Sequence, residues 1–227
     1  MDLKLYEQFL LFSLDKIKGK FLVDSLALNY GLAGAILFQL SESEVIRFEN
    51  KKLIYDFKKV TEDKILEDAI ELFKKSKKLR SVKYWVNKLG SKSSFYKKQI
   101  LNDLINRKII SIQKKKFLWI FTFTYYPIVD YTDMAQLKTK LVDIVLNFKK
   151  ADLESVLLLS LIHSCKLTRI LFPDKKDHKK ANERLKVLTK DLEIGEAVSQ
   201  TIKEIQAAVI IASTSAVVAA TAASTSS

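Results

Sequence analysis

The chain has 227 residues, of which 48% are hydrophobic, and it carries a formal net charge of +13. This apolar content is enough for a substantial core and excludes a largely disordered chain. Five glycines and two prolines interrupt it, so long helices are favoured and an all-β sandwich or barrel is disfavoured. The charge comes mostly from lysine, which favours diffuse attraction to polyanions over bidentate reading of bases.

The residues that carry most enzyme chemistry are scarce. Cys165 is the single cysteine, which excludes a disulfide framework and a cysteine-rich zinc site and indicates a reducing compartment. Paired carboxylates, a metal-ligand cluster or a nucleophile–base pair cannot be assembled around two histidines and one cysteine. We therefore predict a cytoplasmic protein that is not an enzyme, with no catalytic residue, metal or cofactor.

The first part of the chain predicts helices around one short hairpin. Gly31 and Gly34 lie inside the second helix, and two glycines three apart predict that another backbone approaches it closely. This helix should be central. Thr61 is the expected cap of the third helix, and Gly90 is expected to end the fourth. The apolar periodicity places these helices at residues 3–14, 24–40, 62–75 and 79–89, and the hairpin at 45–57.

A basic helix precedes the most unusual stretch of the sequence. The helix begins near Ser93 and carries Lys97, Lys98 and Arg107 beside an apolar stripe. A second hairpin follows at about residues 109–126, because β-branched isoleucines lead into an aromatic run. The expected reversal lies at the three lysines between them, Lys114, Lys115 and Lys116. The apolar residues expected beside this basic tip are Phe117, Leu118, Trp119 and Phe121.

Several functions suit a basic helix followed by an apolar hairpin. One is contact with a bilayer that contains anionic lipids. A second is a winged-helix arrangement that binds nucleic acid, although the helix lacks a cluster of base-reading side chains. A third is an oligomerisation arm without lipid contact. The plainest alternative is a hairpin packed on helices with a solvated lysine turn.

The remainder of the chain predicts further helices. They lie at residues 134–148, 152–171, from 179 onward and 198–223. The last of these loses all charge after Glu204, so it is expected to be either a core helix that frays or a C-terminal anchor. The fold class is therefore mainly α: a single globular helical-bundle domain over 1–212 with one protruding hydrophobic β-hairpin, a second short hairpin, and a tail at 213–227.

Four separated segments resemble the Golgi phosphoprotein 3 family in order and spacing. They are residues 5–15, 31–40, 114–127 and 157–164. The resemblance implies a helical domain with a hydrophobic hairpin for membrane contact or oligomerisation, and binding to phosphatidylinositol 4-phosphate. Eukaryotic members are peripheral Golgi adaptors for glycosyltransferases. The lysine- and isoleucine-rich composition is more similar to bacterial members, for which a Golgi location is not implied.

The lipid pocket of the family maps onto four positions of this chain. The family's tryptophan falls at Leu22 or Asp24, and an arginine falls at Ala33. Two further arginines fall at Ser94 and Lys97, of which only Lys97 keeps a positive charge. Each lost charge-assisted hydrogen bond to phosphate is worth about 1.5–3 kcal/mol. We therefore expect a peripheral protein that is attracted to anionic lipid generally, with little selectivity for one head group.

Overall fold

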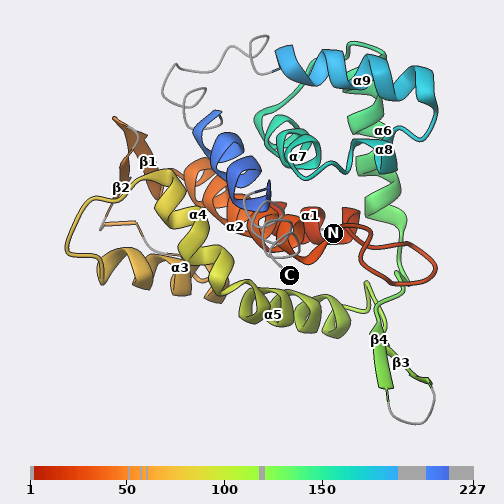
Figure 1. The fold of residues 1–227 in the computed structure, drawn as a ribbon, viewed down its shortest axis with the longest axis horizontal. Helices are drawn as coiled ribbons and strands as arrows, with labels where there is room; N and C mark the ends of the chain where they lie inside the picture. Colours follow the sequence, from red (N-terminus) through yellow and green to blue (C-terminus); the bar gives the residue numbers. More distant parts are fainter. Residues whose placement is uncertain are drawn as a thin grey trace, which may run out of the picture.

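The computed structural model describes residues 3–50, 52–56, 58–59, 61–117, 121–188 and 203–214, and most of these are helical (Figure 1). The predicted fold class, mainly α with two small hairpins, is confirmed. The labelled helices are α1 (Leu5–Phe12), α2 (Ser25–Glu42), α3 (Lys64–Lys74), α4 (Val82–Ser91), α5 (Ser93–Asn106), α6 (Thr132–Leu146), α7 (Leu153–Ser164), α8 (Thr168–Leu171) and α9 (Lys175–Val187). The strands are β1 (Ile46–Glu49), β2 (Lys52–Tyr55), β3 (Gln113–Phe117) and β4 (Phe121–Tyr125).

Helix α2 lies at the centre of the molecule, as predicted (Figure 1). It begins after Asp24, whose carboxylate accepts hydrogen bonds from the backbone N–H groups of Leu26 and Ala27, each at 2.9 Å. Helices α1, α3, α4, α5 and α7 pack around it, and strand β1 also contacts it. Because neighbours cover it on nearly all sides, α2 is apolar around most of its circumference rather than along one stripe.

The two glycines of α2 make room for side chains. A Cβ atom at Gly31 would lie 2.2 Å from the ring of Phe9, and one at Gly34 would lie 2.9 Å from Leu161 and from Val209. The predicted approach of another backbone is wrong, because the nearest neighbours of both glycines are side chains. Val209 belongs to the helix at residues 203–214, which therefore shares the core with α2.

Several predicted element boundaries differ from the structure, among them the start of α9, which lies at Lys175 and not at residue 179. Asp63 caps α3 in place of Thr61, because its carboxylate accepts from the N–H groups of Ile65 and Leu66. Helix α4 continues through Gly90 to Ser91. The helix predicted at 152–171 is divided into α7 and α8 by a turn in which Lys166 has a φ of 60°.

The first hairpin packs against the helices. Strands β1 and β2 pair antiparallel with Phe48 opposite Leu53, and both side chains are buried together with Ile46. The outward residues Arg47 and Glu49 form an ion pair at 2.7 Å. This alternation is typical of a strand pair with one face on the core.

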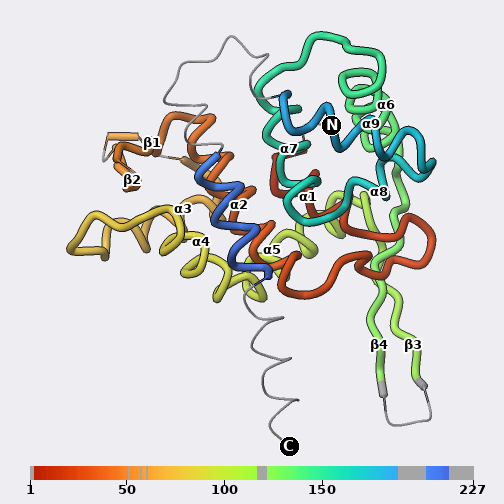
Figure 2. The backbone as a smooth tube through the Cα atoms, turned by 45° about the horizontal axis from the view of Figure 1, so that its top comes forward, coloured from red at the N-terminus to blue at the C-terminus, as the bar shows by residue number. Residues whose placement is uncertain are grey.

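The second hairpin projects away from the helices (Figure 2). Strands β3 and β4 pair antiparallel, with Lys115 opposite Phe123. The predicted reversal at Lys114, Lys115 and Lys116 is wrong, because all three lysines lie within β3. The chain reverses between Phe117 and Phe121 instead. Consecutive lysines can occupy a strand here because solvent surrounds both of its faces.

The structure describes part of the helix that is predicted at residues 198–223. Residues 203–214 form a helix whose Ile205, Ala208 and Val209 are buried, as expected of a core helix. The rest of the predicted tail, from residue 215 onward, lies outside the described residues. Within the part of the chain that the structure describes, no helix combines the length and apolar composition needed to cross a bilayer.

Candidate functional site

The β3–β4 hairpin presents two chemically different faces. Residues directly opposite each other on paired strands share a face, and neighbours along a strand alternate. Lys114 and Lys116 pair with Thr124 and Thr122, which gives one face of lysine and threonine. The other face carries Lys115 opposite Phe123, and it continues to Tyr125, opposite Gln113. We call this second one the aromatic face.

Neither face is covered by the helices. The side chains of Gln113 to Lys116 and of Thr122 to Thr124 are exposed, and Phe123 keeps 49% of its surface accessible. The alternative of a hairpin packed on helices is therefore wrong for these residues. Leu118 and Trp119 lie outside the described residues, and only the backbone of Phe117 and Phe121 is described. The described part of the aromatic face therefore presents Phe123 to solvent on a projecting strand pair.

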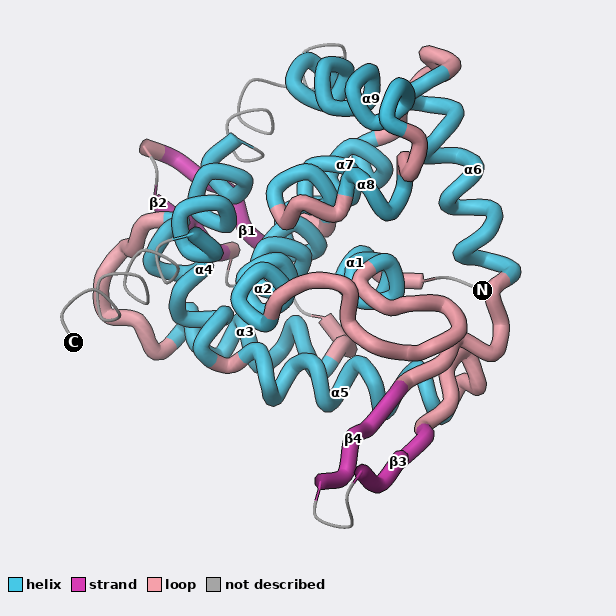
Figure 3. The backbone as a smooth tube through the Cα atoms, turned by 45° about the vertical axis from the view of Figure 1, so that its right-hand side comes forward, coloured by secondary structure: helices cyan, strands magenta, loops and turns pink. Residues whose placement is uncertain are grey.

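The base of the hairpin is held firmly although its strands project. Ile110 and Ile128 form a further β-bridge below the strands, and the N–H of Ser111 donates to the carbonyl of Pro127 at 2.9 Å. On the other side, the N–H of Tyr126 donates to the carbonyl of Gly19 at 2.9 Å. The projection is therefore a supported arm, visible in Figure 3 beside the loop between α1 and α2.

The structure brings Lys97 close to this base. The Lys97 ammonium lies 5.4 Å from the ring centre of Phe21, and the rings of Phe21 and Tyr126 lie 6.4 Å apart. Lys98 is exposed on the neighbouring position of α5. Lys97 therefore lies beside the base of the hairpin that carries the three lysines of β3.

Arg107 has a different environment from the lysines with which the sequence groups it. Its guanidinium lies 2.7 Å from a carboxylate oxygen of Glu7 and 3.0 Å from one of Asp103. Glu7 is almost fully buried, and that burial raises its pKa, although Arg107 and the N–H of Lys4 act in the opposite direction. Arg107 therefore ties α5 to α1. Glu7, 100 residues away in the sequence, could not be identified as its partner from local patterns.

A hollow beside this ion pair is lined by four carboxylates. Burial alone would raise the pKa of Asp63, but hydrogen bonds from Lys4 and Tyr6 hold it below its usual range. Asp103 and Glu62 add further carboxylates to the lining of this hollow. The hollow measures about 400 Å³ and is lined by Lys4, Tyr6, Glu7, Glu62, Asp63, Lys64, Ile65, Gln99, Ile100, Asn102, Asp103 and Asn106.

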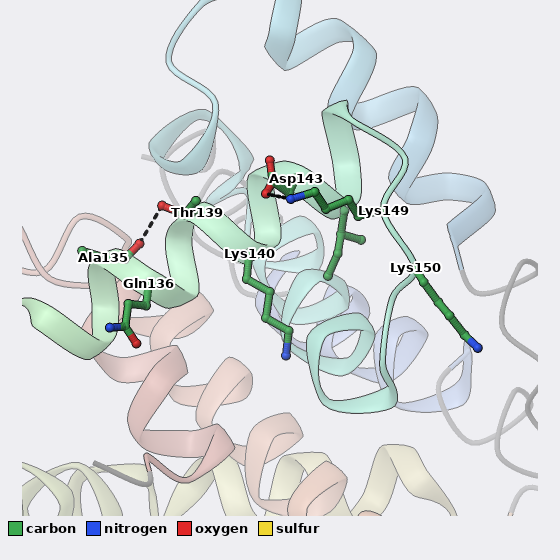
Figure 4. A pocket seen from close by; sticks show the side chains of 8 residues that line it. Ala135, Gln136, Thr139, Lys140, Asp143, Lys149 and Lys150 are labelled. Carbon is green, nitrogen blue, oxygen red and sulfur yellow. Dashed lines mark hydrogen bonds and ion pairs between the residues drawn. The ribbon is translucent and has the colours of Figure 1, made fainter.

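A second hollow, on α6, lies apart from the predicted residues (Figure 4). It measures about 550 Å³, and two of its three lysines pair with the protein's own carboxylates. Lys149 pairs with Asp143 at 2.6 Å, and Lys140 pairs with Asp152 at 2.7 Å. Among the described residues, no group of three or more His, Cys, Asp or Glu side chains could hold a metal ion.

The sequence patterns did not predict a functional role for the loop at residues 15–22. It carries Lys16, Lys18 and Lys20, and the sequence suggested only that these residues end the first helix. The structure places this loop against the hairpin base. The alternation of lysine with Ile17 and Gly19 is the one local signal that could have pointed to it.

The four positions that correspond to the family's lipid pocket offer one cation in this chain. Ala33 is buried at 1% exposure in α2 and offers no side-chain donor. Leu22 and Asp24 are exposed, and the Asp24 carboxylate is occupied as the cap of α2. Ser94 is exposed on α5, which leaves Lys97 as the only cation of the set.

Comparison with protein families identifies the family to which this chain belongs. The family model described as Golgi phosphoprotein 3 (GPP34) matches residues 5–205. This range includes α1 to α9, both hairpins and the start of the last described helix. The chain therefore belongs to the Golgi phosphoprotein 3 family.

Proposed function

We propose that this member of the Golgi phosphoprotein 3 family is a peripheral protein, without catalytic activity, that binds anionic lipid membranes through the β3–β4 hairpin. The observation that carries the proposal is the combination of three exposed lysines and an exposed phenylalanine on a strand pair that stands clear of the helices. Lys97 and Lys98 extend the positive charge toward α5. Opposite charge draws such a surface to acidic head groups, and the aromatic ring suits the interfacial layer below them.

Charge alone is too weak to hold the protein on a membrane. Each lysine near an anionic surface contributes about 1 kcal/mol, so five lysines contribute about 5 kcal/mol, which corresponds to a dissociation constant near 0.2 mM. Stable peripheral binding generally needs a second, apolar signal. Phe123 is the described side chain that supplies it. The proposal therefore requires both the lysines and the aromatic face.

We expect the protein to recognise the negative charge of a lipid head group and not its chemical structure. Lys97 is the single cation at the pocket positions, and an ammonium is a point charge without the fork that a guanidinium offers to phosphate. We expect phosphatidylinositol 4-phosphate to be bound no better than other anionic lipids at equal surface charge. The contribution of the lysines should fall with added salt.

Vesicle flotation tests the proposal. Wild-type protein is mixed with vesicles of phosphatidylcholine alone, with added phosphatidylserine, or with phosphatidylinositol 4-phosphate at matched charge. We expect flotation with both anionic compositions, release by salt, and no flotation with neutral vesicles. Failure to float with any anionic vesicle would exclude the proposal. Equal flotation with neutral vesicles would exclude the role of the lysines.

A mass measurement distinguishes membrane binding from the alternative that the hairpin is an oligomerisation arm. Mass measurement of Phe123→Ser beside wild type shows whether the aromatic face holds copies of the chain together. An oligomer that dissociates in the variant, with no vesicle binding by either protein, would favour an arm for self-association. A gel shift at low salt tests the nucleic-acid alternative. We expect no binding of nucleic acid at the hollow beside α5, because carboxylates line it.

A further inference from the structure

We propose that the loop at residues 15–22 is a second membrane-contact element, which inserts Ile17 into the same anionic bilayer that the hairpin meets. This inference rests on the proposed function and extends it to a segment outside the hairpin. The partner is a lipid surface because the loop combines an exposed aliphatic side chain with closely spaced lysines.

The loop is built to hold Ile17 outward. The Asp15 carboxylate accepts hydrogen bonds from the N–H groups of Ile17 at 3.0 Å and Lys18 at 2.6 Å. The N–H of Asp15 donates to the carbonyl of Lys20 at 2.8 Å, which closes the loop. Gly19 has a φ of +61°, a conformation that other residues adopt at a cost. The tip is therefore preorganised, and Ile17 is 81% exposed without any need for rearrangement.

The loop is fixed to the hairpin base rather than free beside it. The N–H of Ile128 donates to the carbonyl of Lys16 at 3.2 Å. A Cβ atom at Gly19 would lie 2.3 Å from the backbone of Tyr126 and Pro127, so only glycine permits this approach. The loop is therefore joined to the hairpin base, and the two lie side by side (Figure 3).

The loop lies on the side of the hairpin that carries the aromatic face. The ammonium of Lys20 is 5.5 Å from the ring centre of Tyr125, and the ammonium of Lys115 is 5.7 Å from the same ring. Tyr125 and Phe123 share one face of β4. The basic and apolar groups thus continue from Phe123 across Tyr125 to Lys20 and the loop.

The chemistry of the tip matches an anionic interface. Ile17 stands between Lys16 and Lys18, and Leu22 at the end of the loop is 44% exposed. The ammonium of Lys16 lies 3.9 Å from the ring centre of Tyr131, which holds it beside the protein surface. Lysines that reach the head groups while an aliphatic side chain enters the layer below form a favourable interfacial arrangement.

A fluorophore at position 17 tests the contact directly. Cys165 is buried, and burial raises its thiol pKa to about 12, so an Ile17→Cys variant can be labelled selectively with an environment-sensitive dye. Phe148→Cys is the matched control, because Phe148 is 71% exposed but follows the end of α6 that is remote from the hairpin. With phosphatidylserine vesicles we expect a blue-shifted emission at position 17 and none at position 148.

The outcomes separate this inference from the proposed function. If the protein floats with the vesicles but the dye at position 17 does not respond, the loop has no membrane contact and the hairpin acts alone. A response at position 148 equal to that at position 17 also overturns the inference. If wild-type protein does not bind anionic vesicles at all, the proposed function fails first. As a label-free check, Ile17→Asp should weaken vesicle binding about tenfold, since it replaces apolar insertion with a charge.

Discussion

The two hairpins of this chain have the same local structure and opposite surroundings. In β1–β2, every second side chain of β1 enters the core, and Phe48 is 5% exposed. In β3–β4, the side chains of residues 113–116 and 122–124 are exposed on both faces, and Phe123 is 49% exposed. A two-stranded hairpin is marginally stable in water unless something supports it. The first hairpin is supported by the core, while the second, among the residues that the structure describes, is supported at its base.

The largest expected effect on stability comes from a substitution in the first hairpin, and the matched substitution in the second hairpin should have little effect. Phe48→Ala removes a buried aromatic ring and should lower the free energy of unfolding by about 3–5 kcal/mol. Phe123→Ala, the matched change on the exposed strand, should alter it by less than about 0.5 kcal/mol. Urea denaturation of both variants measures the difference. Equal losses would show that the second hairpin is packed in solution.

The basic residues show the same contrast, because Arg107 stabilises the fold whereas Lys115 is exposed on the hairpin. Arg107→Met leaves the buried Glu7 carboxylate without its cation, which should lower the free energy of unfolding by about 3 kcal/mol. Adding Glu7→Gln should recover part of this loss. Lys115→Met on the hairpin should leave stability unchanged. A harmless Arg107→Met would return Arg107 to the set of membrane-facing cations.

Acid should weaken the helical body and not the hairpin, which has no carboxylate in its described strands. Burial would raise the pKa of Asp63 and Asp68, but lysine and tyrosine partners hold both pKa values below their usual range. Such groups stabilise the fold above their unfolded pKa of about 4, and that contribution is lost as the pH falls through the lower folded pKa. Glu7, whose pKa is raised, acts in the opposite sense. Asp63→Asn should flatten the loss of stability below about pH 4, as followed by urea midpoints.

The smallest expected effect distinguishes the two faces of the second hairpin. Lys115→Glu should weaken binding to phosphatidylserine vesicles more than Lys114→Glu does, because Lys115 shares the aromatic face with Phe123. The difference should be about 1 kcal/mol, or roughly fivefold in affinity. Identical affinities would mean that the hairpin meets the membrane by its tip and not by one face.

Much of the fold could be predicted from the sequence because apolar periodicity reflects burial. It located the central helix α2, the helices around it and both hairpins. The reversal of the second hairpin was misplaced because a run of lysines is more often a turn than a strand, and a strand solvated on both faces has no alternation to reveal it. The partnership of Arg107 with Glu7 and the docking of the 15–22 loop on Tyr126 join distant segments, which local patterns do not show.

Membrane affinity of a charge-reversed hairpin tests the central claim most directly. The variant Lys114→Glu, Lys115→Glu and Lys116→Glu is compared with Lys175→Glu, Lys176→Glu and Lys179→Glu, which makes the same change in net charge on exposed positions of α9 at the far end of the molecule (Figure 1). The hairpin variant should bind phosphatidylserine vesicles at least about 100-fold more weakly than wild type, since three contributions of about 1 kcal/mol are lost. The α9 variant should remain within about threefold of wild type, because its charges lie beyond the Debye length of about 8 Å from the membrane. Equal affinity of wild type and the hairpin variant would contradict the assignment of β3–β4 as the membrane-binding element.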